Sequence, residues 1–240
     1  MDILVLGDSH SGCFRCLNPK QSTYDSHSKC FRCLSPEQST YHFNVKLVEG
    51  ASARGLSNLN STTQSRRLFS EKLGNSKDAI KVLMVLGEVD CGYLAYISAK
   101  KYKTTINEQL VKSCENLISF IEDVVIGEHG FTCDQVIILG SFLPAIKDTT
   151  FKKCLHALRP NVDANQKERT LKTLFFNNRL KSRCKQKGFT YFDITGDTMG
   201  TDGIIKDAYL HPNVYNHHLD ITTIWPLLLK EFSSAFSHPN

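Results

Sequence analysis

The sequence predicts an α/β protein in which a parallel sheet of about five strands is covered by helices on both faces, giving three α/β/α layers. Short apolar segments of strand length alternate along the chain with longer amphipathic segments, as in repeated β–α units. Two strand segments, residues 3–6 and 82–86, are apolar at every position, which is typical of strands buried on both faces of a parallel sheet. The 240 residues suffice for one such domain, and we expect no second one.

The expected elements follow one another in a regular order. Strands are expected at residues 3–6, 42–48, 80–86, 135–139 and 189–194. Helices are expected at residues 63–73, 106–125, 163–186 and 221–232. Within 106–125 the apolar residues recur at three- and four-residue intervals, which is the spacing of an amphipathic helix on a sheet.

Composition and charge favour a soluble globular protein. Charged residues make up 22% and hydrophobic residues 41% of the chain, and the net charge of +5 is dispersed. A dispersed charge gives little support to a nucleic-acid partner. The basic segment 163–186 leaves a polyanion-binding face as an alternative, but one solvated face of a helix explains its charges equally well. No apolar run approaches the ~18 residues that span a bilayer, and the first residues show no secretory signal.

An internal duplication follows the first strand. Residues 8–24 recur as residues 25–41 with three changes, so we expect this segment to enlarge one loop or helix of the single domain, 1–240. Two copies are too few for a solenoid, which needs at least ~3 stacked units. The second copy repeats Asp-Ser-His at Asp25, Ser26 and His27.

The nine cysteines are an odd number, and several lie within apolar patterns. This usage favours reduced thiols in a cytoplasmic protein over a disulfide framework. Two CxxC pairs, Cys13 with Cys16 and Cys30 with Cys33, have a spacing that is typical of a structural zinc site. The second pair exists because the first was copied, so zinc remains only an alternative to an assignment of no metal and no cofactor.

A serine follows the first strand at the place where open α/β sheets bind their ligands. Ile3 to Leu6 is closed by Gly7, and Ser9 comes two residues later, where backbone N–H groups are unpaired and can hold an oxyanion. The alternative is a polar residue that only caps the next helix. Gly7-Asp8-Ser9-His10 resembles the first motif block of the SGNH (GDSL-type) hydrolases, in a GDSH form. The resemblance implies a flavodoxin-like fold with Ser9 as the nucleophile and with Asp8 and His10 beside it among the binding residues.

Two further blocks of the family are matched more loosely. After the second strand, Gly50 or Gly55 is the candidate for the glycine whose N–H joins the oxyanion hole. Gly87-Glu88-Val89-Asp90 resembles the third block in a GEVD form, with Glu88 and Asp90 as binding candidates. The asparagine of that block is replaced by Val89, which cannot donate a hydrogen bond.

The C-terminal block of the family supplies a histidine as general base and an aspartate three residues before it. His218 is the first candidate for the base, followed by His217 and His211, and all three remain open. None has an aspartate three residues earlier, so Asp207, four residues before His211, and Asp220 are the substitute acids.

The resemblance implies hydrolysis of acyl esters through an acyl-serine intermediate. A small-molecule or carbohydrate ester is the expected substrate, with O-acetyl groups on carbohydrate as one candidate. Two alternatives stay open: an O-acyltransferase that uses the same site, and a catalytically inactive binding protein, which the missing asparagine and aspartate favour. The sequence indicates neither a membrane partner nor an oligomeric state.

Overall fold

The computed structural model describes residues 1–17, 41–150 and 162–237, with the side chains of 16, 17, 236 and 237 excepted. Its centre is a five-stranded parallel sheet with the order β2-β1-β3-β4-β5. The strands are β1 (Asp2–Gly7), β2 (His42–Leu47), β3 (Lys81–Val85), β4 (Val136–Leu139) and β5 (Thr190–Phe192). The predicted α/β class, the strand number and the parallel direction are all confirmed.

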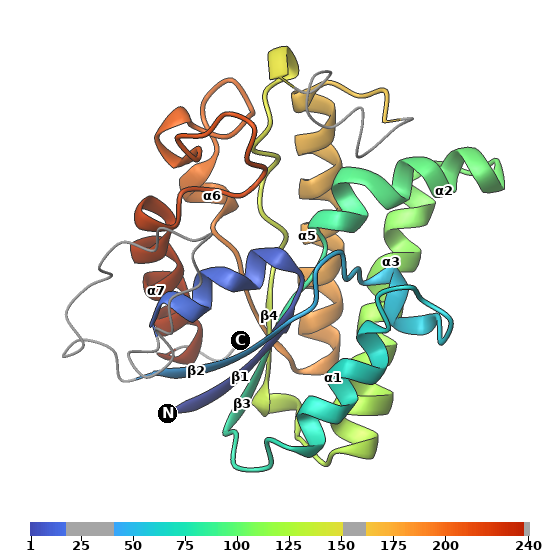
Figure 1. Ribbon diagram of the computed structural model, residues 1–240, viewed down its shortest axis with the longest axis vertical. Coiled ribbons are helices and arrows are strands. Elements are labelled where there is room, and N and C mark those ends of the chain that lie inside the picture. Colours follow the sequence, from blue (N-terminus) through green and yellow to red (C-terminus); the bar gives the residue numbers. More distant parts are fainter. Residues whose placement is uncertain (18–40, 151–161, 238–240) are drawn as a thin grey trace.

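Helices cover both faces of this sheet (Figure 1). On one face lie α1 (Ser65–Gly74), α3 (Ile106–Phe120) and α5 (Gln166–Lys187), with α2 (Ala95–Tyr102) beside them. The other face is covered by a 3₁₀ segment, Ser9–Leu17, and by α7 (Ile221–Ser237), with the short α6 (Thr195–Thr198) nearby. A π-helical turn at Asp90–Leu94 precedes α2, and another at Ile121–Glu128 extends α3.

Alternation along the strands divides the core into two clusters. In β1, Leu4 and Leu6 face the α1, α3 and α5 side, where they pack with Phe176 of α5. Ile3 and Val5 face the opposite side, in the cluster that also contains residues of α7. The four residues Ile3 to Leu6 are fully buried, so this part of β1, which is covered on both faces, has to be apolar at every position.

The strand order reverses its direction between β1 and β3, since the chain moves outward to β2 and then returns to build β3, β4 and β5. In open α/β sheets the crevice at the carboxyl ends of the strands beside this reversal is the usual ligand site. The registers place Gly7 of β1 opposite Val85 of β3, and Val85 opposite Leu139 of β4. The residues that follow these three strands therefore meet at one edge of the sheet.

Two α-helices of the described residues were not predicted from the sequence, and one part of the sequence prediction is not described. Residues 95–102 show no clear apolar period, yet they form α2, and the four residues of α6 are too few to give a pattern. The second copy of the duplication, from Asp25 to Thr40, lies outside the described residues, as does Ser26 within it. Among the residues described, no helix is both long and apolar enough to cross a membrane.

Candidate active site

Gly7 ends β1 in a space that admits no side chain. A Cβ atom at this position would lie 2.5 Å from the Val85 carbonyl oxygen and 2.7 Å from Cβ of Ser11. The close approach lets the Asp8 N–H donate to the Val85 carbonyl oxygen at 3.1 Å, which joins the turn to β3. Ser9 therefore begins its 3₁₀ segment directly above the sheet edge between β1 and β3.

The Ser9 hydroxyl lies beside an imidazole from the far end of the chain. The distance between Oγ of Ser9 and Nε2 of His218 is 3.0 Å, which is a hydrogen bond. His218 comes from the loop before α7, the helix that packs on the same face of the sheet as the Ser9–Leu17 segment. The packing of α7 thus brings the predicted nucleophile and the first-choice base within proton-transfer distance.

The other nitrogen of the His218 ring is held by an asparagine. Oδ1 of Asn216 lies 2.8 Å from Nδ1 of His218 and also accepts the backbone N–H of His218 at 3.0 Å. An oxygen there requires the proton of the neutral ring to be on Nδ1, which leaves the Nε2 lone pair facing the Ser9 hydroxyl. Ser9, His218 and Asn216 are thus arranged as a serine–histidine–asparagine triad.

His218 is kept neutral by its surroundings. Burial of the ring lowers its pKa to about 3, and the neighbouring His10 and His217 act in the same direction. The charge of Glu88 opposes this shift, though its effect is smaller. At neutral pH the ring therefore has a lone pair available to accept a proton.

Two further imidazoles pack against His218. The ring centroids of His10 and His217 lie 4.4 Å and 4.1 Å from that of His218. His10 is buried, and its Nδ1 lies 3.3 Å from Oδ1 of Asp8, which also accepts the His10 backbone N–H. Asp8 and His10 thus form a buried pair beside Ser9.

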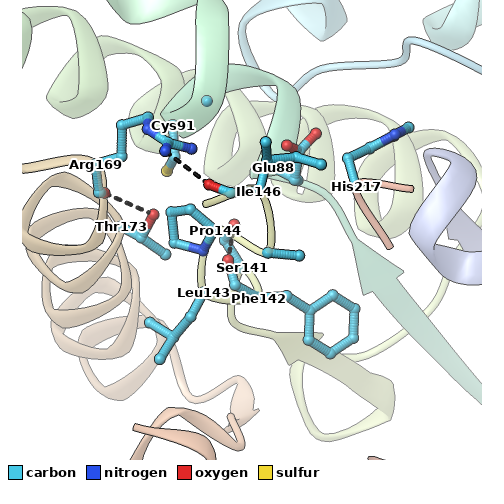
Figure 2. Close-up of a pocket in the computed structure, with 12 residues that line it drawn as sticks. Glu88, Cys91, Ser141, Phe142, Leu143, Pro144, Ile146, Arg169, Thr173 and His217 are labelled. Atoms are coloured by element: carbon cyan, nitrogen blue, oxygen red, sulfur yellow. Dashed lines mark hydrogen bonds between the residues drawn. The ribbon is translucent and has the colours of Figure 1, made fainter. Parts of the chain in front are cut away.

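A small pocket opens next to this cluster (Figure 2). It has about 350 Å³ of empty space, counting its mouth, and Glu88 and His217 lie on one side of it. The segment after β4 supplies Ser141 and Phe142, and α5 supplies the buried Arg169, which donates to the Ile146 carbonyl oxygen at 2.8 Å. The remaining lining residues are Cys91, Gly92, Leu143, Pro144, Ala145, Ile146 and Thr173.

Comparison with known proteins gave matches among solved structures only. No family model matches the sequence, and no curated protein matches it. A Streptococcus pneumonia protein proposed to be a platelet activating factor is 14% identical, with a TM-score of 0.57 over 97% of this chain and 83% of that one. An acetyl xylan esterase is 12% identical, with a TM-score of 0.51 over 98% of this chain and 99% of the other. The M. smegmatis aryl esterase is 12% identical, with a TM-score of 0.50 over 95% and 98%.

The chain shares the three-layer α/β/α fold of these solved structures. At these identities the likeness concerns the arrangement of the backbone, and the chemistry has to be argued from the side chains. The GDSH and GEVD forms of the motifs remain predictions from the sequence.

Two residues predicted for the C-terminal block, Asp207 and His211, pair with residues other than Ser9 and His218. The Asp207 carboxylate is exposed and forms an ion pair with Lys147 at 2.7 Å. Nδ1 of His211 accepts the backbone N–H of Asn213 at 3.0 Å, within its own turn. Asn216 holds the place expected for Asp207. It was not predicted because it is no acid and lies two residues, not three, before His218. The sequence feature that could have predicted this role is an amide oxygen, a neutral hydrogen-bond acceptor, two residues before His218.

The carboxylate of Asp90 is fully buried and holds two segments of the chain together. It accepts the backbone N–H groups of Ala53 at 2.7 Å and Arg54 at 2.9 Å. Burial raises its pKa to about 6, and these hydrogen bonds oppose part of that shift. Asp90 therefore fixes the loop after β2 against the π-helical turn after β3, whereas Glu88 lies in the pocket.

The two candidate glycines of the second block differ in what their N–H groups do. The N–H of Gly55 donates within its own turn, to the carbonyl oxygen of Ser52 at 3.1 Å and to its hydroxyl at 3.0 Å. Gly50 lies just after β2 with a φ of +69°, in the left-handed region that favours glycine. Because the Gly55 N–H is already engaged, Gly50 is kept as the candidate for an oxyanion donor.

The cysteine predictions are tested only in part. Cys13 is half-buried, whereas the side chain of Cys16 and all of Cys30 and Cys33 lie outside the described residues. The zinc alternative at these four cysteines thus stays untested. Cys91 lines the pocket, and its burial raises the pKa of the thiol, which keeps it protonated.

Proposed function

We propose that the chain is a serine ester hydrolase that works through an acyl-serine intermediate. The observation that carries this proposal is the continuous hydrogen-bonded line from Oγ of Ser9 to the His218 ring and on to Oδ1 of Asn216. A serine at its ordinary pKa is a weak nucleophile, and an oriented neutral imidazole is the group that activates it. The likeness to an acetyl xylan esterase and an aryl esterase supports the same chemistry.

In the first half-reaction, Oγ of Ser9 attacks the ester carbonyl carbon while Nε2 of His218 accepts the hydroxyl proton. The new Oγ–C bond gives a tetrahedral oxyanion. Its collapse breaks the bond to the alcohol oxygen, which takes the proton back from Nε2 and leaves. In the second half-reaction water attacks the acyl carbon by the same route and releases the acid and the free Ser9.

The oxyanion needs N–H donors. The amide of Ser9 is suited to this role because it precedes the first hydrogen-bonded turn of its 3₁₀ segment. The amide of Gly50 is the second candidate. Val89 offers no side-chain donor at the place of the family's asparagine, and one missing contact of this kind typically adds about 3 kcal/mol to the barrier. We therefore expect a slow hydrolase.

The small pocket favours a short acyl group. It has no room for a long acyl chain, and Phe142 and Leu143 give it apolar walls. Acetyl esters fit this description better than long acyl chains. O-acetyl groups on carbohydrate are accordingly our preferred substrate class, and the acetyl xylan esterase among the structural neighbours supports this choice.

Labelling with a fluorophosphonate probe tests the proposal directly, because only an activated serine reacts. We expect one labelled peptide, containing Ser9, and loss of both labelling and p-nitrophenyl acetate hydrolysis in Ser9→Ala. The matched control is Ser26→Ala, since the duplication places this serine in an identical Asp-Ser-His-Ser sequence. Labelling at Ser26, or equal activity in wild type and Ser9→Ala, would refute the proposal.

Two alternatives give different results in the same assays. An O-acyltransferase would form the same acyl-serine but deliver the acyl group to an added alcohol or sugar, which product analysis detects. A binding protein without catalytic activity would bind esters but remain unlabelled. Val89 is the feature that favours this second alternative.

A further inference from the structure

Three imidazoles converge beside Ser9, although the proposed triad uses only one of them. His10 follows β1 in sequence, whereas His217 and His218 come from the loop before α7. One ring nitrogen from each residue can be chosen so that all three lie within 4.8 Å of one another. The ring centroids of His10 and His217 lie 5.4 Å apart, so the three imidazoles form a compact cluster.

The spacing is close to that of a metal site. Zinc binds imidazole nitrogens at about 2.0–2.1 Å in tetrahedral geometry, which places two ligand nitrogens about 3.4 Å apart. The cluster therefore has to close by at most ~1.4 Å. His217 is half-buried on a loop, where a change of rotamer can supply such a movement.

Two of the rings are oriented as metal ligands usually are. A ligating histidine normally directs its second nitrogen to a carboxylate or an amide oxygen, which fixes the ring. Nδ1 of His10 lies 3.3 Å from the Asp8 carboxylate, and Nδ1 of His218 lies 2.8 Å from Oδ1 of Asn216. In His218 the nitrogen that remains for a metal ion is Nε2, which faces Ser9.

We propose that His10, His217 and His218 form a binding site for a divalent transition-metal ion such as Zn²⁺, and that the bound ion holds Ser9 inactive. Both nitrogens of His218 are engaged in the triad, one by Ser9 and one by Asn216. A metal ion on Nε2 uses the lone pair that would accept the Ser9 proton, and a metal ion on Nδ1 displaces Asn216. Binding stands on the geometry alone, whereas inhibition rests on the proposed function.

Titration of the metal-free full-length chain with Co²⁺ tests the site without any activity assay. Imidazole ligation gives visible d–d bands, whereas thiolate ligation adds an intense near-ultraviolet charge-transfer band, which separates this cluster from the cysteine pairs. We expect one Co²⁺ per chain with visible bands, and at least a tenfold weaker affinity in His217→Gln. The matched control is His42→Gln. His42 is an exposed histidine of β2 whose ring contacts the Asp2 carboxylate of β1.

His217→Cys guards against a result that reflects misfolding. This variant restores a metal ligand and should add the thiolate band, which places the ion at residue 217. Equal Co²⁺ affinity in wild type, His217→Gln and His42→Gln, or no new band in His217→Cys, would refute the site.

Inhibition is measured separately, with p-nitrophenyl acetate as substrate. We expect Zn²⁺ to inhibit wild type and His42→Gln reversibly, with EDTA restoring activity, and to need at least tenfold higher concentration in His217→Gln. Co²⁺ binding without inhibition of an active enzyme would refute the inhibitory role. Absence of esterase activity without metal would refute the proposed function, and the spectra would still decide the metal site.

Discussion

Oδ1 of Asn216 lies 2.8 Å from Nδ1 of His218, on the opposite side of the ring from Ser9. A carboxylate in this position would both fix the tautomer and stabilise the imidazolium that forms when the serine loses its proton. A neutral amide fixes the tautomer but offers much less to the charged ring. The proposed triad is thus arranged for orientation more than for charge stabilisation.

Asn216→Asp should raise the pKa of His218, because an opposite charge beside the ring favours its protonated form. We expect the acid limb of the kcat/KM profile to move to higher pH by at least one unit, with kcat at pH 8 equal to or above that of wild type. Asn216→Ala should lower kcat about tenfold to hundredfold, since the tautomer is then no longer fixed. A pH–rate series on the three proteins measures both effects. Unchanged kcat in Asn216→Ala would show that the amide does not orient the base.

The wild-type enzyme should stay active in mild acid. The pH dependence of kcat/KM reports the pKa of the base in the free enzyme, and that of His218 is lowered to about 3. We expect kcat/KM at pH 5 to remain above half of its value at pH 7. A base with the ordinary histidine pKa of about 6.5 would retain only ~4% of its pH 7 value. A half-maximal rate near pH 6.5 would therefore contradict the burial of this ring.

Asp90 should make folding less favourable as pH rises from about 4 to 6. Its pKa is about 6 in the native state and 3.8 in the reference state, so the native protein binds more protons than the unfolded chain in this window. Between pH 4 and pH 7 this effect lowers the free energy of unfolding of wild type by about 2–3 kcal/mol. Asp90→Asn should lack this loss. The loss of a hydrogen-bond acceptor for Ala53 or Arg54 adds a constant penalty to the variant at every pH. Urea unfolding at the two pH values checks the difference, and parallel pH dependences would contradict it.

Gly7→Ala should be strongly destabilising, because the new methyl group meets the Val85 carbonyl oxygen at 2.5 Å and neither backbone segment can move without disturbing the β1–β3 ladder. We expect a loss of at least ~2 kcal/mol. Gly196→Ala is the matched control, since a Cβ there has nothing within 4 Å and should change stability by less than ~0.5 kcal/mol. The midpoints of urea unfolding compare the two variants, and equal midpoints would contradict the steric argument.

The fold was largely predictable because its strongest signals are local. A strand such as β3, buried on both faces, has to be apolar throughout, and Gly7 and Gly87 mark the ends of two strands by their position. α2 was not predictable in this way, because its eight residues follow an irregular π-helical turn and show no regular apolar spacing. It ends at Lys103 in the left-handed region, without a glycine to mark the end.

The two main residues of the site were predictable from the sequence, but the residues that hold them in place were not. Ser9 and His218 follow from motifs with a chemical reason, whereas the choice among His211, His217 and His218 depends on how the last loop folds back over β1. The role of Asp90 also depends on tertiary structure, since its partners are backbone N–H groups of a loop 36 and 37 residues earlier. No local pattern encodes such a contact.

Ser9 and His218 are separated by 209 positions in the chain. At ribosomal rates of about 5–20 residues per second, the hydroxyl is made roughly 10–40 s before its partner ring. A nascent polypeptide therefore has no functioning acylation centre until the last strand and α7 have docked, so turnover also reports that the whole domain has closed. Fragments that end before residue 218 should consequently be silent toward esters, however well their sheet has formed.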